Sequence, residues 1–159
     1  MKQTVQMREI QRKMGPGIIT REGFLGSDNR NLPDILTDDD AAVIHLGLTH
    51  RGISRRMAEL RDAGAAGLGE FITVKPHFEI RVDSVRGKLP CPFGDPGLFR
   101  KTNTTVRNLR LGREITYTDL HIHLISMHGF YEGKGSAFRV EPRELAEVLE
   151  VVAGEGDRQ

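Results

Sequence analysis

The sequence has no tryptophan, a single cysteine and few aromatic residues, which make up 6% of its 159 residues. One cysteine excludes an intramolecular disulfide and any zinc or iron–sulfur site that needs several thiolates. No apolar run approaches the ~18 residues of a membrane-spanning helix, and the N-terminal stretch MKQTVQMREIQRKMG lacks the apolar core of a signal peptide. We therefore expect a cytoplasmic protein with no membrane partner.

What the chain does contain is enough for a small core. Hydrophobic residues make up 38% and charged residues 28% of the sequence, a balance typical of a folded protein and not of a disordered one. The length predicts a single domain over 1–159. We expect a short, frayed helix within 1–17 and a disordered tail at 153–159.

Local patterns predict a mixture of helices and strands. Apolar residues at helical spacing and capping residues indicate helices, and alternation of apolar and polar residues indicates strands. The expected helices are 4–14, 41–46 (behind a cap at Thr37 to Asp40), 50–63 and a last one that opens at Glu141-Pro142. The expected strands are 71–74, 78–85, 104–111 and 113–118, with loops at 18–33 and 86–103.

Residues 119–128 fit two structures. Thr118-Asp119 in front and Gly129 behind favour a helix, whereas the alternation of Leu120, Ile122 and Leu124 favours a strand. The boundary signals lead us to expect a helix. The whole pattern predicts a single compact α+β domain, with a helical hairpin near the N-terminal half followed by two β-hairpins, and with terminal helices.

The small net charge of +1 conceals an uneven distribution. Residues 48–113 carry 13 basic and 6 acidic side chains, a net charge of +7, whereas residues 114–159 carry a net charge of −5. A basic block that gathers on one face would attract a polyanion such as DNA or RNA. The alternative is that these arginines are scattered and pair with the acidic C-terminal part.

One stretch within residues 42–57 resembles a known family. It reads LGLTHRGISRRM from Leu46 to Met57: Gly47 permits a tight turn, Leu48 fills the space between two helices, and Thr49 caps the second helix. This arrangement resembles the turn and second helix of a helix-turn-helix DNA-binding module, and the strands that follow resemble the wing of its winged variant.

The resemblance implies a nucleic-acid interface. In such a module the outward side of the second helix meets base edges and phosphates, and the wing meets the backbone. The residues that this assigns to nucleic-acid contact are His50, Arg51, Ser54, Arg55, Arg56, Lys75 and Arg81.

A histidine cluster offers a metal site as the second hypothesis. In a strand, His121 and His123 share a face and can bind one zinc or iron ion. In a helix, His121 and His128 lie two turns apart, too far apart to share a metal directly, and His123 points elsewhere. A further ligand could come from Cys91, Asp119 or Glu132, and an open position would let the metal activate water for hydrolysis. The candidate ligands are His121, His123, His128 and Cys91.

The glycine-rich stretch GFYEGKGSAFR from Gly129 to Arg139 suggests a third hypothesis. Exposed backbone amides near Lys134, Ser136 and Arg139 could bind a phosphate or carboxylate. The spacing is not that of a nucleotide-binding P-loop, because Gly135 follows Lys134 where that motif needs Ser or Thr.

These patterns leave three functions open. The leading one is a small nucleic-acid-associated or regulatory binding protein that uses the basic central region. The alternatives are a metal-dependent hydrolase or lyase built on the histidines, and a non-catalytic binder of an anion or small molecule. The sequence does not decide whether the protein is an enzyme, and it leaves a homodimer open.

Overall fold

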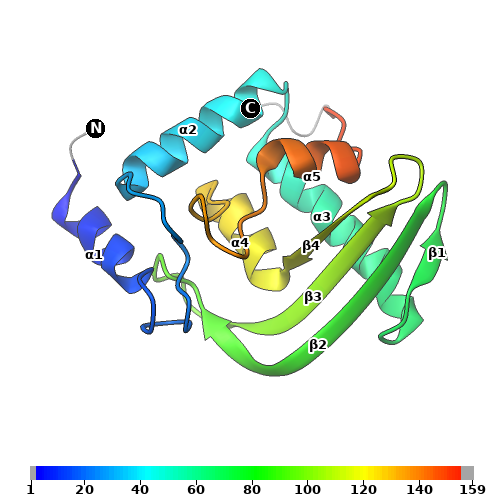
Figure 1. The fold of residues 1–159 in the computed structure, drawn as a ribbon, viewed down its shortest axis with the longest axis horizontal. Coiled ribbons are helices and arrows are strands. Elements are labelled where there is room, and N and C mark those ends of the chain that lie inside the picture. Colours follow the sequence, from blue (N-terminus) through cyan, green and yellow to red (C-terminus); the bar gives the residue numbers. More distant parts are fainter. Residues whose placement is uncertain (1–2, 155–159) are drawn as a thin grey trace.

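The computed structural model describes residues 3–154 and confirms the α+β class (Figure 1). In that part of the chain the helices are α1 (Val5–Lys13), α2 (Leu32–His45), α3 (His50–Gly64), α4 (Asp119–His128) and α5 (Pro142–Val148), with a 3-10 turn η1 (Ala65–Gly67). The strands are β1 (Ile72–Val74), β2 (Phe78–Pro90), β3 (Leu98–Asn108) and β4 (Arg113–Thr118). A disordered tail is expected at 153–159, and residues 155–159 of it lie outside the described residues.

Helix α2 begins nine residues earlier than the sequence pattern predicts. Asn31 caps it by accepting a hydrogen bond from the Asp34 N–H, and Pro33 lies in its first turn. A side-chain cap followed by proline is a strong start signal. The cap expected at Thr37 to Asp40 is therefore wrong, and these residues lie inside the helix.

Helix α3 and the turn before it match the expectation. Thr49 caps the helix through the Gly52 N–H, and Gly47 has φ 74°, the left-handed conformation that favours glycine. Helix α4 is also confirmed: Thr118 caps its first turn, and Gly129 ends it with φ 61°. Among residues 3–154, no helix has both the length and the apolar character needed to cross a bilayer.

The four strands form an antiparallel sheet in the order β1-β2-β3-β4. Here the loop expected at 86–103 is wrong, because β2 continues to Pro90 and β3 starts at Leu98. A bulge between Val85 and Lys88 takes up Arg86 and Gly87, and the pairing then resumes. The glycine and prolines that suggested a loop therefore mark a bulge and the end of a strand.

The outer part of this hairpin is only two strands wide. Strand β1 pairs with β2 no further than Ile80, and β4 pairs with β3 only from Asn103 to Asn108. Within the described residues, 84–90 of β2 and 98–102 of β3 therefore pair only with each other. We call these two segments the outer ribbon. Figure 1 shows the hairpin as a long curved ribbon whose outer end reaches toward α1.

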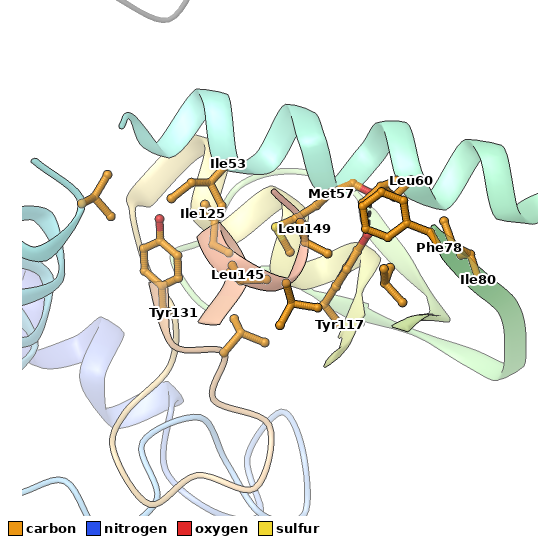
Figure 2. Packing of buried hydrophobic residues seen from close by; sticks show 14 residues of the cluster. Ile53, Met57, Leu60, Phe78, Ile80, Tyr117, Ile125, Tyr131, Leu145 and Leu149 are labelled. Carbon is orange, nitrogen blue, oxygen red and sulfur yellow. Dashed lines mark hydrogen bonds between the residues drawn. The ribbon is translucent and has the colours of Figure 1, made fainter. Parts of the chain in front are cut away.

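Helices α3, α4 and α5 gather on the concave side of the sheet (Figure 1). Figure 2 shows Ile53, Met57 and Leu60 of α3 directed into the core, where Phe78 and Tyr117 come from the strands. The Tyr117 hydroxyl donates a buried hydrogen bond of 2.7 Å to the Met57 carbonyl. This bond ties β4 to α3 inside the core.

A second core cluster lies under the outer ribbon. It joins the N-terminal segment to α4, and its buried members are Met14, Phe24, Leu32, Ile35, Cys91, Leu120, Leu124 and Phe130. The turn at the end of the ribbon thus belongs to this cluster through Cys91.

The Tyr117 hydrogen bond predicts a measurable loss of stability. Tyr117→Phe leaves the buried Met57 carbonyl without its donor, and we expect the free energy of unfolding to fall by roughly 1–3 kcal/mol in urea denaturation. Tyr131→Phe is the matched control, because the His50 ring that bonds its hydroxyl is half-buried and can turn to water. Equal losses in the two variants would contradict this account.

Glu150 predicts an acid-dependent loss of stability. Its carboxylate accepts hydrogen bonds from Arg110, Asn108 and His77, and the bond from Arg110 is the main cause that lowers its pKa from 4.5 to about 2. A depressed pKa stabilises the fold above pH ~4.5, and this contribution is lost as the pH falls toward ~2.

Glu150→Gln should therefore lower the free energy of unfolding at pH 7 by about 1 kcal/mol, since solvent screens part of the interaction. The difference from the wild-type protein should shrink as the pH falls from 4.5 to 2. Chemical denaturation across this pH range tests it, and a difference that is constant over the range contradicts it.

Candidate metal centre

The turn that connects the outer ribbon brings a thiol and a carboxylate together. The Gly94 N–H donates to the Cys91 carbonyl oxygen at 3.0 Å, which closes a tight turn. Gly94 has φ 93°, which an L side chain rarely adopts. Because the chain reverses here, Cys91 and Asp95 face the same helix, α4.

Helix α4 supplies two imidazoles to the same place. His123 lies near its middle and His128 is its last residue. Both Nε2 atoms lie at hydrogen-bond distance from Oδ2 of Asp95, at 2.8 Å for His123 and 2.7 Å for His128. The Cys91 Sγ lies 3.8 Å from Nε2 of His128. The four ligand atoms all lie within 4.8 Å of one another.

Aromatic rings fix the two imidazoles in orientation. Phe93, from the turn itself, stacks on His128 with centroids 4.0 Å apart and planes 6° apart. Phe99, from β3, packs against His123 at 4.4 Å. Phe93 also makes an edge contact with the buried Phe130. The imidazoles are thus held in place before any ion binds.

The surroundings shift the pKa values of the thiol and the carboxyl in opposite directions. The hydrogen bond from His128 is the main cause that lowers the pKa of Asp95. Burial is the main cause that raises the pKa of Cys91, while backbone hydrogen bonds from Asp95, Phe93 and Gly94 act to lower it. Asp95 therefore offers a carboxylate, whereas the surroundings favour the thiol form of Cys91, which would lose its proton on binding a metal.

The structure keeps three of the four candidate ligands together and separates the fourth. His121 accepts a hydrogen bond from the Thr118 N–H on Nδ1, and its Nε2 contacts Glu132 at 2.6 Å. It therefore lies outside the cluster. Two other candidate ligands are also engaged elsewhere, since Asp119 pairs with Arg61 and Glu132 with His121.

The expectation that His123 points elsewhere in a helix is wrong. His123 and His128 are five positions apart on α4, and both side chains reach Asp95, which projects between them from the turn. Asp95 itself was missed by the sequence reasoning. The signal that could have found it is the tight-turn pattern Cys91-Pro92-Phe93-Gly94, which places the next residue beside the cysteine.

Of the seven residues assigned to nucleic-acid contact, at least His50, Ser54, Arg56 and Arg81 are engaged within the fold. His50 contacts the Tyr131 hydroxyl and Asp40. Ser54 is buried. Arg56 donates a hydrogen bond to the Leu149 carbonyl, and the Arg81 guanidinium lies over the Phe71 ring. Arg51, Arg55 and Lys75 are exposed.

The outward orientation expected for Ser54 is wrong for a packing reason. Helix α3 packs against both the sheet and α4, so its buried face is wider than the stripe of Ile53, Met57 and Leu60. Gly52 and Ser54 also belong to this buried face.

Part of the basic block is neutralised by the acidic C-terminal segment. Arg110 pairs with Glu150, and Arg113 pairs with both Glu144 and Glu147. This is the alternative that the charge distribution left open. The helix-turn-helix function stays a prediction.

The stretch from Gly129 to Arg139 uses several of its polar groups within the fold. The Arg139 side chain is 6% exposed and pairs with Asp39 and Glu141. The Ser136 hydroxyl donates to Glu132, and the Lys134 N–H donates to Asp28. These contacts engage Ser136, Arg139 and the Lys134 backbone within the fold, whereas the Lys134 side chain is exposed, and anion binding by this stretch stays a prediction.

Comparisons with protein-family models, with curated proteins and with solved structures found no match for this chain.

Proposed function

We propose that the protein binds one zinc ion through Cys91, Asp95, His123 and His128, and that the ion fastens the outer ribbon to α4. The observation that carries this proposal is the convergence of four ligand atoms within 4.8 Å of one another, from two segments distant in sequence. A thiolate, two imidazoles and a carboxylate are a donor set that suits zinc.

Hydrogen bonds hold the four side chains in place without the ion. One oxygen of Asp95 contacts the Nε2 atoms of both histidines. A metal ion would take the place of the protons between these atoms, because imidazole binds a metal through an unprotonated nitrogen and cysteine binds as the thiolate. The cluster therefore needs only small side-chain movements to close around an ion.

The number of donors favours a structural role over hydrolysis. A hydrolytic zinc ion typically keeps three protein ligands and one position for water, whereas a structural one has four. Here the protein supplies four donors. Cys91 is buried, and the His123 and His128 side chains are 16% and 20% exposed.

The fold indicates what such an ion would stabilise, namely the outer ribbon. A ribbon of two strands is marginally stable alone, and the outer ribbon has no third strand in the described part of the chain. Two ligands come from the turn at its end and two from α4. The ion would therefore join a weakly supported segment to a helix of the main core.

Metal analysis with ligand variants tests this proposal. Protein stripped with a chelator and reloaded should hold one zinc per chain, measured by mass spectrometry of the metal. Cobalt in its place should show a thiolate charge-transfer band that Cys91→Ser abolishes. His123→Ala and His128→Ala should each weaken zinc binding by more than about 100-fold in competition titrations.

His45→Ala is the matched control, because His45 is an exposed histidine on α2 outside the cluster. It should leave zinc binding unchanged. Binding well below one ion per chain, or binding that survives in the double variant His123→Ala/His128→Ala, would overturn the proposal.

A further inference from the structure

A cavity of about 370 Å³ lies beside the outer ribbon, apart from the metal cluster. Its walls come from the segment before α2, from the ribbon, from the start of α4 and from the loop after α4. The volume falls in the range of sites that hold small molecules. None of the four proposed zinc ligands lines this cavity, so the cavity is a separate site.

A buried histidine–glutamate pair lines the cavity. The side chains of His121 and Glu132 are 4% and 5% exposed. The Thr118 N–H donates to Nδ1 of His121, so the proton of the neutral ring lies on Nε2, which donates to Oε2 of Glu132. The other oxygen of Glu132 accepts from the Ser136 hydroxyl. The carboxylate is thus held rigidly.

Glu132 keeps hydrogen-bonding capacity toward the cavity. Each carboxylate oxygen can accept two hydrogen bonds, and the structure assigns one to each. Glu132 has φ 72°, a left-handed conformation that is uncommon for this residue type. A bound molecule with an N–H or O–H group could therefore donate to this fixed acceptor.

Three cations line the same cavity and have no ion-pair partner in the described part of the chain. Arg21, Arg100 and Lys101 make no ion pair within residues 3–154, in contrast to Arg110 and Arg113. The acidic side chains in the lining are Glu22 and Glu132, so the cations outnumber them. Unpaired cations around a partly enclosed space favour an anion there.

The rest of the lining is apolar. Phe24 and Leu120 are buried, and Leu89 is half-buried. Val85 and Phe138 also line the cavity and remain about half exposed, at 54% and 55%. Exposed apolar side chains around a cavity are typical of a surface that a ligand covers.

We infer that this cavity binds a small organic anion that has an apolar body and a hydrogen-bond donor. The anionic group lies against Arg21, Arg100 and Lys101, the body lies between the apolar walls, and the donor faces Glu132. A carboxylate, a sulfonate or a phosphate ester satisfies the same chemistry. A cationic ligand drawn to Glu22 and Glu132 is the alternative, and it predicts that a negative charge on a probe weakens binding.

A matched pair of fluorescent probes tests the inference on the intact protein. 8-Anilinonaphthalene-1-sulfonate and N-phenyl-1-naphthylamine share the aromatic rings and the N–H donor, and only the first carries a negative charge. We expect the sulfonate to bind at one site per chain by calorimetry, about tenfold more tightly than the neutral probe. Its affinity should fall as salt rises.

Charge variants locate the site. The double variant Arg100→Glu/Lys101→Glu should weaken sulfonate binding by at least about tenfold and leave the neutral probe within twofold. Arg21 lies on a separate segment, and Arg21→Gln should also weaken sulfonate binding. This variant therefore tests the site even if the double variant does not fold. The matched control is Lys75→Glu, an exposed cation at the opposite end of β2 that does not line the cavity, and it should have no effect.

Three results would overturn the inference: no binding of the sulfonate, equal affinity for both probes, or sulfonate affinity that none of the cavity variants changes. The cavity and the metal cluster share no residue, so the charge variants test the cavity while all four proposed zinc ligands remain in place.

Discussion

The place of the outer ribbon against α4 is decided by how the end of a long two-stranded hairpin is held. Beyond Ser84 and Thr102 the paired strands have no further strand beside them within the described residues. Backbone hydrogen bonds alone would leave such a ribbon marginally stable. The contacts at its tip, from Cys91 and Asp95 to α4, therefore set where the ribbon lies. An ion at this point would replace weak hydrogen bonds by metal–ligand bonds.

The same ribbon forms part of the cavity. Leu89 pairs with Phe99 and Arg100 pairs with Lys88 in the ribbon, and both Leu89 and Arg100 line the cavity. The metal cluster lies at the tip, a few residues further along. An ion that fixes the tip would thus also fix the wall that carries Arg100 and Lys101. The two proposals concern separate residues, but they share this mechanical element.

Helix α4 connects the two sites from the other side. His121 belongs to the cavity, whereas His123 and His128 belong to the metal cluster. The helix is fixed by a cap at Thr118 and by Gly129 at its end. The three histidines of this one helix thus lie in two different sites, one in the cavity and two in the metal cluster.

Local sequence signals predicted much of the fold. Thr49, Thr118 and Gly129 mark the helix ends that the structure shows, and Lys75-Pro76-His77 forms the turn between β1 and β2. The failures arose where pairing over a distance decided the outcome. The bulge at Arg86 and Gly87 looked like a loop because the partner strand that keeps it in the sheet cannot be read from the local pattern.

The same reasoning explains the outcome at the metal cluster. The sequence suggested Cys91, His123 and His128 because of their chemistry, but it could not show that His121 turns away to Glu132. Nor could it reveal Asp95, whose position depends on a turn at the end of a ribbon that was expected to be a loop. The residue types indicated which side chains could bind a metal, but only the fold shows which of these side chains converge.

Hydrogen exchange with and without zinc shows whether the ion fastens the outer ribbon. If it does, the amides of 84–89 and 98–102 should exchange more slowly when zinc is bound, by up to about 100-fold at zinc concentrations 100 times the Kd. The amides of 104–108, which lie between two neighbouring strands, should change much less. Bound zinc that leaves the exchange of the outer ribbon unaltered would contradict the account.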